Sequence, residues 1–187
     1  MLKYEIRSRT MDIELFRKTR FSVHKDEAGL LYAITKLTSP RVVLEFGTLS
    51  CLTAVNFLNA MDEDSHLYTV DLHRPSELNL IYDKRLTFLQ KNQIDFVPSD
   101  IGNKKIDLVY IDASHNFEMN KKTYWAIIGN MSQGSYIILH DTAKWAGQDG
   151  EVLFAEWLGN KHKKIDFHCD RKRRWGITVF QVFSYAF

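Results

Sequence analysis

The chain has 187 residues, a length typical of one compact domain. Its 25 basic and 23 acidic side chains leave a net charge of +2, which argues against a protein that mainly coats nucleic acid or an anionic membrane. Hydrophobic residues make up 45% of the chain, enough for a folded core, and no apolar run reaches the roughly 20 residues that a membrane span needs.

Two sequence features indicate the compartment. The two cysteines, Cys51 and Cys169, lie far apart and predict buried thiols rather than a disulfide framework. The first residues carry charges where a secretory signal would be apolar. We therefore expect a cytoplasmic protein with no membrane partner.

Short apolar runs alternate along the chain with segments of helical periodicity, the pattern of βαβ units and a mostly parallel sheet. A first helix is predicted from the apolar residues Leu30, Leu31, Ile34 and Leu37, and it should end at Ser39 and Pro40. We therefore divide the chain into an N-terminal helical segment, 1–40, and a main domain, 41–187.

The sequence of the main domain predicts seven strands. They are expected at 42–44, 66–72, 94–97, 106–111, 136–139, 165–168 and 177–182, with helices after the first strand and at about 76–90, 117–128 and 151–158. The short basic turn before the last strand indicates a hairpin, so that strand should run antiparallel. The predicted fold is a single α/β domain with a Rossmann-like, doubly wound, mostly parallel seven-stranded sheet whose last strand is antiparallel.

Acidic residues recur where the predicted strands end. Glu45, Asp71, Asp112 and Asp141 follow four different strands. The carboxyl ends of parallel strands share one edge of a sheet, and ligands bind there. One such acid would be read as the cap of the next helix, but four in succession predict a site for hydroxyls, an ammonium group or a metal ion.

The turn after the first strand restricts the ligand. A dinucleotide fold needs Gly-x-Gly-x-x-Gly there, but only Gly47 is present, and Leu49 and Leu52 occupy the other two positions. Their side chains would obstruct a pyrophosphate, whereas a nucleoside without phosphates is acceptable. Asp71, 24 residues after Gly47, is then placed to bind both ribose hydroxyls.

Four segments in this order resemble the class I S-adenosylmethionine-dependent methyltransferases. Residues 43–48 are similar to the first motif of that family and residues 68–72 to its ribose-binding strand. Residues 107–115 and 134–142 together resemble the small-molecule O-methyltransferase branch that includes the macrolide-sugar enzymes, with catechol O-methyltransferase a more distant relative. The resemblance extends from about Glu27 to the C-terminus, and it departs from the family at Leu49 and Cys51, where glycines are commoner.

The resemblance implies roles for individual residues. The cofactor-binding set is Glu45, Gly47, Thr48, Ser50, Asp71, Leu72, Asp100, Ile101 and Asp112. Within it, Glu45, Gly47, Thr48 and Ser50 would line the methionine end, Asp71 would hold the ribose, and Asp100 and Ile101 would contact the adenine. A divalent cation, magnesium or manganese, would be bound by Asp112, His140 and Asp141, although an imidazole at the middle position suits transition metals better. His115 would be the general base.

The spacing of Asp112 and His115 supports the same chemistry independently of the resemblance to this family. The two residues are three positions apart between a strand and a helix, so both can face one cavity. An imidazole of ordinary pKa can accept a hydroxyl proton at neutral pH, and a bound metal would lower the pKa of that hydroxyl. The alternative for His115, and for the pair His140 and Asp141, is a packing or capping role.

The sequence therefore predicts S-adenosylmethionine-dependent, metal-assisted O-methylation of a small-molecule acceptor, such as a sugar or a catechol-like compound. Two alternatives remain at this level. One is a nucleic-acid methyltransferase that uses the basic turn 171–174, and the other is a binding module of the same fold that has lost turnover. Because no large insertion interrupts the strands, acceptor specificity would come from the N-terminal helical segment or from a partner subunit, which leaves a homo-oligomer open.

Overall fold

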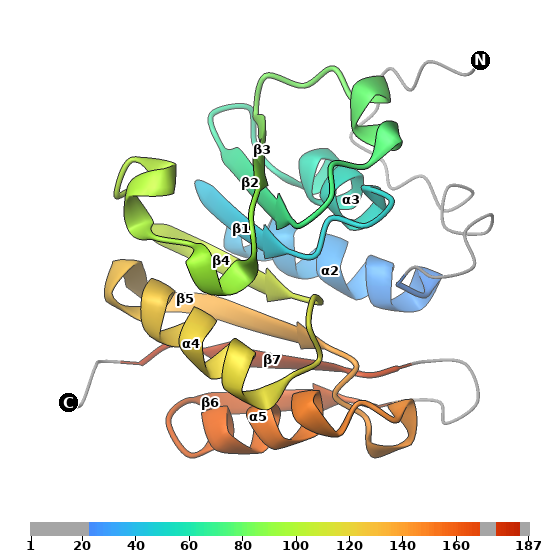
Figure 1. Ribbon diagram of the computed structural model, residues 1–187, viewed down its shortest axis with the longest axis vertical. Helices are drawn as coiled ribbons and strands as arrows, with labels where there is room; N and C mark the ends of the chain where they lie inside the picture. The colour runs from blue at the N-terminus through green and yellow to red at the C-terminus, as the bar shows by residue number, and fades with distance from the viewer. Residues whose placement is uncertain (1–22, 169–174, 184–187) are drawn as a thin grey trace.

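The computed structural model describes residues 23–168 and 175–183, which form a seven-stranded sheet with helices on both faces (Figure 1). The strands are β1 (Val42–Phe46), β2 (His66–Asp71), β3 (Leu86–Gln90), β4 (Ile106–Ile111), β5 (Met131–His140), β6 (Lys163–Phe167) and β7 (Ile177–Gln181). Their order is β3-β2-β1-β4-β5-β7-β6, and β7 is antiparallel to both of its neighbours. The predicted fold class is confirmed.

The helices form two layers that enclose the sheet. They are α2 (Lys25–Thr38), α3 (Leu52–Ala60), α4 (Phe117–Ile127) and α5 (Asp149–Gly159), with short 3₁₀ turns η1 (Ser76–Leu80), η2 (Gln93–Asp95), η3 (Pro98–Ile101), η4 (Ile128–Asn130) and η5 (Lys144–Ala146). One apolar core packs α2 and α3 against the sheet, around Leu31 and Phe57. A second packs α4 and α5 against the opposite face, around Tyr124 and Phe154.

The third strand is where the sequence prediction is wrong. The sequence predicts a helix at about 76–90 and a strand at 94–97, but β3 is Leu86–Gln90 and Gln93–Asp95 is a 3₁₀ turn. Just before β3, the guanidinium of Arg85 binds Asp83 and three backbone carbonyls, which fixes the loop that leads into the strand. The apolar residue Phe96 is buried, but it packs edge-on against Phe46 from a loop.

Some expectations concern residues at the limits of the described structure. Cys51 is buried and free, as predicted, and burial raises the pKa of its thiol to about 12. Cys169, the basic turn 171–174 and the first seven residues lie outside the described residues. In the portion of the chain that is described, no helix combines the length and the apolar character that a membrane crossing requires.

The topology determines where a ligand can bind. From β1 the chain proceeds to β2 and β3 on one side of the sheet, and it then crosses back to β4 on the other side. The carboxyl ends of β1 and β4 therefore flank the point where the strand order reverses. In open α/β sheets this is the position of the ligand crevice.

Candidate functional site

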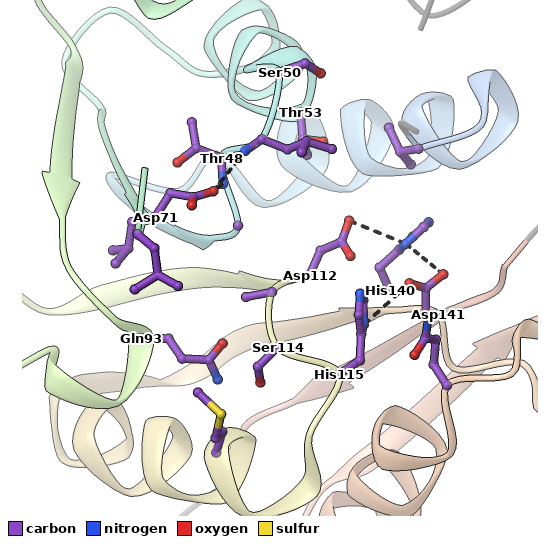
Figure 2. A pocket seen from close by; sticks show the side chains of 18 of the residues that line it. Thr48, Ser50, Thr53, Asp71, Gln93, Asp112, Ser114, His115, His140 and Asp141 are labelled. Atoms are coloured by element: carbon purple, nitrogen blue, oxygen red, sulfur yellow. Dashed lines mark hydrogen bonds and ion pairs between the residues drawn. The ribbon is translucent and has the colours of Figure 1, made fainter. Parts of the chain in front are cut away.

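A pocket of about 590 Å³ opens at that edge of the sheet, a volume within the range of small-molecule sites. Its lining includes most of the residues that the sequence singled out: Gly47, Thr48, Ser50, Asp71, Leu72, Asp112, His115, His140 and Asp141. Figure 2 shows the labelled side chains of this set, among them Asp71, Asp112 and Asp141, converging from the ends of β1, β2, β4 and β5. Of the predicted set, Glu45, Asp100 and Ile101 do not line it.

The turn after β1 is tightly wound against β4. Gly47 has a φ of +100°, and a Cβ atom on it would lie 1.9 Å from the carbonyl oxygen of Asp112, so only glycine fits. Leu49 and Cys51 also have left-handed backbone, with φ of 41° and 63°. The positions where the family more often has glycine are thus positions where glycine is conformationally favoured, and this chain carries side chains there.

Asp71, at the end of β2, joins the β1 turn to the neighbouring strand. Its Oδ2 accepts hydrogen bonds from the backbone N–H groups of Thr48 and Leu49, at 2.9 and 3.0 Å, and its Oδ1 accepts one from His73 at 3.2 Å. An ionised carboxylate offers about four acceptor positions. Asp71 can therefore hold the turn and still accept a hydrogen bond from a ligand hydroxyl.

Glu45 lies beneath this turn, completely buried. Its Oε2 accepts a hydrogen bond of 2.5 Å from Thr69, whose hydroxyl also contacts that of Thr48, and its Oε1 has no partner among the described residues. Burial, followed by the nearby charges of Asp112 and Asp71, raises the pKa of Glu45 to about 8. The carboxyl group therefore supports the pocket from behind rather than lining it.

Asp100 and Ile101 are placed elsewhere because β3 ends earlier in the chain than predicted. Asp100 receives Lys91 Nζ at 2.6 Å and the backbone N–H of Val97, and Ile101 is part of the core. The residues that follow the true third strand, Lys91, Asn92 and Gln93, line the pocket instead. Gln93 is 5% exposed, and its Oε1 has no partner in the described structure.

The opposite end of the pocket gathers charged side chains from β4 and β5 (Figure 2). His140 Nδ1 lies 3.3 Å from Asp141 Oδ1 and 3.5 Å from Asp112 Oδ2. His115 Nδ1 lies 3.5 Å from Asp141 Oδ2. Both His115 and Asp141 have left-handed backbone, at φ of 49° and 56°, a strain that is found most often in functional sites.

Two carboxylates from the helical layers contact the two imidazoles. Glu27 Oε2, from α2, lies 3.4 Å from His140 Nε2, while Glu27 Oε1 accepts hydrogen bonds from the backbone N–H groups of Trp175 and Gly176. Glu151 Oε1, from α5, lies 3.4 Å from His115 Nδ1. Glu27 is 4% exposed and Glu151 is completely buried.

These contacts raise the pKa of both histidines. Burial alone would lower the pKa of His140, but Asp112, Asp141 and Glu27 raise it well above its usual value. The Glu151 carboxylate, whose Oε1 lies 3.4 Å from Nδ1, raises the pKa of His115. In return, the pKa of Asp112 is held below its usual value by the two imidazoles, in spite of its burial.

A buried hydrogen-bond chain extends from Glu151 across the pocket floor. Glu151 Oε2 accepts from Asn120 Nδ2 at 2.7 Å, and Asn120 Oδ1 accepts from Gln93 Nε2 at 2.9 Å. Asn120 is fully buried in α4. Buried side chains thus connect Glu151, beside His115, to Gln93, which lines the pocket.

The site also contains a group suited to a cation. Asp112, His115 and Asp141 can each offer one ligand atom, and these atoms lie within 4.8 Å of one another. The sequence predicted the set Asp112, His140 and Asp141, which shares both carboxylates and differs in the histidine. Two carboxylates with one imidazole form a donor set that suits manganese and related transition metals, and also magnesium with added water.

Sequence reasoning missed three contributors: Glu27, Glu151 and Gln93. Glu27 and Glu151 both occupy the first turn of a helix, where acids are common because they complement the helix dipole. Because their position in a helix already explains both acids, the sequence contains no sign of their contacts with His140 and His115. Gln93 was missed because the strand before it was misplaced.

The chain resembles known proteins both in sequence, through a family match, and in structure. Residues 44–142 match the family described as "Methyltransferase domain", which covers more than half of the chain. Comparison with curated protein sequences finds no match.

Solved structures with the same fold include an O-methyltransferase, TomG, from Streptomyces achromogenes in complex with SAM, at a TM-score of 0.73 and 18% identity, covering 91% of this chain and 86% of TomG. A methyltransferase from Geobacter sulfurreducens has a TM-score of 0.69 and 12% identity, with 91% and 85% covered. An O-methyltransferase from Bacillus cereus in complex with SAH has a TM-score of 0.66 and 14% identity, with 91% and 86% covered. At these identities the likeness establishes the fold.

Proposed function

The chain belongs to the methyltransferase-domain family, and on that premise we propose that it transfers the methyl group of S-adenosylmethionine to a hydroxyl oxygen of a small molecule. The observation that carries the proposal is the convergence of Asp71, Asp112, His115 and Asp141 on one pocket at the switch point of the sheet. Structures with this fold that hold SAM or SAH support the choice of cofactor.

The pocket end formed by β1 and β2 suits the nucleoside. Asp71 retains acceptor capacity for a ribose hydroxyl, and the unpartnered Gln93 Oε1 can accept a hydrogen bond from the amino group of adenine. Glu45, which does not line the pocket, is assigned no contact with the cofactor. The spare acceptor capacity of Asp71 and the orphaned acceptor of Gln93 fit donor groups of S-adenosylmethionine.

The chemistry at the other end is a displacement that requires an oxygen nucleophile. S-adenosylmethionine supplies a methyl group on a sulfonium, and as the oxygen–carbon bond forms, the carbon–sulfur bond breaks with its electron pair left on sulfur. Before or during this step the acceptor hydroxyl must lose its proton. His115 is placed to take that proton at Nε2, to which no described residue forms a hydrogen bond, because Nδ1 faces Glu151 and Asp141.

Asp112 and Asp141 would hold a divalent cation, which would lower the pKa of a hydroxyl bound to it. His140 stays fixed between these carboxylates and Glu27, so that three acids share its positive charge. Gln148, Met119 and Val23 also line the pocket.

Calorimetry with S-adenosylmethionine tests the cofactor assignment. We expect saturable heat with the wild-type protein and none with Asp71→Ala, because Asp71 is the proposed ribose ligand and also holds the turn. The far-UV circular dichroism of the variant shows whether it is folded. Absence of heat with the folded wild-type protein would overturn the proposed function.

Titration with manganese or magnesium tests the cation separately. We expect one metal ion to bind to the wild-type protein and binding to be lost in Asp112→Asn, because the cluster loses a carboxylate ligand. Normal cofactor heat in the absence of any metal binding would restrict the proposal to a metal-independent transfer.

A further inference from the structure

Glu151 is a fully buried carboxylate that does not line the pocket, and the transfer described above assigns it no role. Its Oε1 is 3.4 Å from His115 Nδ1, and its Oε2 is held by Asn120 at 2.7 Å. We infer that Glu151 is a positioning residue, which fixes the imidazole of His115 in the tautomer that carries its proton on Nδ1. The inference rests on the proposed function, in which His115 Nε2 is the base.

The backbone places Glu151 against His115 by close packing. Gly150 precedes it, and a Cβ atom on Gly150 would lie 2.2 Å from the carbonyl oxygen of His115. The first turn of α5 therefore lies directly against the loop after β4, with no room for a side chain between them. His115, on the other side of this contact, has a left-handed φ of 49°.

The second oxygen of Glu151 is fixed by a partner that cannot exchange with water. Asn120 is fully buried, donates to Glu151 and accepts from Gln93 at 2.9 Å. With Oε2 held, Oε1 faces His115 Nδ1 at 3.4 Å, and neither of these two atoms has another hydrogen-bond partner in the described structure. Burial raises the pKa of Glu151, while His115 and Asn120 act to lower it. In its ionised form the carboxylate can only accept a hydrogen bond, so the proton of the neutral ring then belongs on Nδ1 and the lone pair on Nε2.

Asp141 is a competing explanation, because its Oδ2 lies 3.5 Å from the same nitrogen. Asp141 also contacts His140 at 3.3 Å, lines the pocket and belongs to the candidate cation group. Glu151 has neither a second imidazole nor access to the pocket. It is therefore the carboxylate that remains available to His115 when the pocket is filled.

The tautomer of His115 can be read directly. In the wild-type protein, at a pH where the ring is neutral, we expect ¹⁵N–¹H correlation spectra to show the proton of His115 on Nδ1. In Glu151→Gln, one amide oxygen can still accept from Asn120, but the amide nitrogen then donates toward His115 Nδ1 and favours the proton on Nε2. In Asp141→Asn the wild-type tautomer should persist.

The kinetic consequence follows from the same substitution. With Nε2 protonated, the base is lost, so Glu151→Gln should lower kcat by about 100-fold or more, with KM for S-adenosylmethionine unchanged. Glu156→Gln removes an exposed carboxylate from the same helix, and it should retain both the wild-type tautomer and the wild-type kcat. The calorimetric heat with S-adenosylmethionine should be the same in all three proteins.

Each result bears on the inference independently of the proposed function. A wild-type His115 with its proton on Nε2, or a Glu151→Gln protein whose tautomer is unchanged, would overturn the inference even if methyl transfer is observed. Should Glu151→Gln fail to fold, the Asp141→Asn spectrum decides, because a proton that stays on Nδ1 assigns the tautomer to Glu151 and a proton that moves to Nε2 assigns it to Asp141. Failure of the proposed function would instead appear as absent cofactor heat, with the tautomer as inferred.

Discussion

The two ends of the pocket are stabilised by different kinds of interaction. At the β1–β2 end, backbone N–H groups of the turn bind one carboxylate, that of Asp71, and the geometry depends on a glycine. At the β4–β5 end, two imidazoles lie among four carboxylates, two of which come from helices far away in the sequence. The first end depends on backbone conformation, and the second on paired buried charges.

The difference predicts how each end responds to substitution. Backbone contacts tolerate most side-chain changes but not a change in the permitted φ or in the space beside a glycine. A buried charge pair is instead sensitive to side-chain changes, because removing one partner leaves the other charge uncompensated in a medium that solvates it poorly. Substitutions at each end can therefore distinguish the two kinds of stabilisation.

Gly47→Ala should have the largest effect at the backbone end. The added Cβ would overlap the carbonyl oxygen of Asp112, and the φ of +100° is unfavourable for alanine. We expect a loss of more than about 3 kcal/mol in the free energy of unfolding, measured with urea, and no cofactor heat. Gly129→Ala is the matched control, since nothing lies within 4 Å of its added Cβ, and it should be tolerated. A Gly47→Ala protein of normal stability would contradict the backbone explanation.

Glu27→Gln should have the next largest effect, at the charged end. The amide can still accept from Trp175 and Gly176, but its nitrogen would face the backbone N–H of His24 and can no longer balance the charge of His140. We expect the free energy of unfolding to fall by about 2–4 kcal/mol.

The control for Glu27 is its neighbour in the same helical turn. Asp26 is 46% exposed at its side chain, and Asp26→Asn should change stability by no more than about 0.5 kcal/mol. Equal losses from the two substitutions would show that the helix dipole, rather than His140, accounts for the effect of Glu27.

Glu45→Gln should have an effect that depends on pH. The pKa of Glu45 is about 8 in the folded protein, against 4.5 for an ordinary glutamate, so the folded state retains a proton that the unfolded chain loses. Stability is therefore lost as the pH rises from about 4.5 to about 8, and the variant, whose amide does not ionise, would avoid that loss. Urea titrations should show similar stabilities near pH 4.5 and an advantage for the variant of about 2 kcal/mol near pH 6, which increases further toward pH 8. A constant difference across this range would contradict the raised pKa.

The sequence could predict the sheet because buried parallel strands are continuous apolar runs, and it could predict Asp71, Asp112 and Asp141 because acids directly follow those runs. It could not predict Glu27 or Glu151, because their partners lie 113 and 36 residues away and helix N-termini favour acids in any case. Gln93 required the correct end of β3, which a short strand beside a turn does not reveal. Local signals therefore located the acids at strand ends, but not the side chains whose role depends on partners distant in the sequence or on the exact end of a strand.

Leu49→Gly should have the smallest effect on the free energy of unfolding, and the sign of that effect tests whether the turn is strained. Leu49 is 62% exposed with a φ of 41°, so its side chain contributes little packing while its backbone is strained. We expect Leu49→Gly to leave the free energy of unfolding unchanged or to raise it by up to about 1 kcal/mol, because relief of the left-handed strain offsets the greater flexibility of glycine in the unfolded chain. Leu37→Gly, at an 86% exposed position within α2, should instead lower it by about 1 kcal/mol. Equal shifts of the urea midpoint in the same direction for the two substitutions would show that the turn carries no strain at Leu49. The preference of the family for glycine at this position would then need a reason other than backbone conformation.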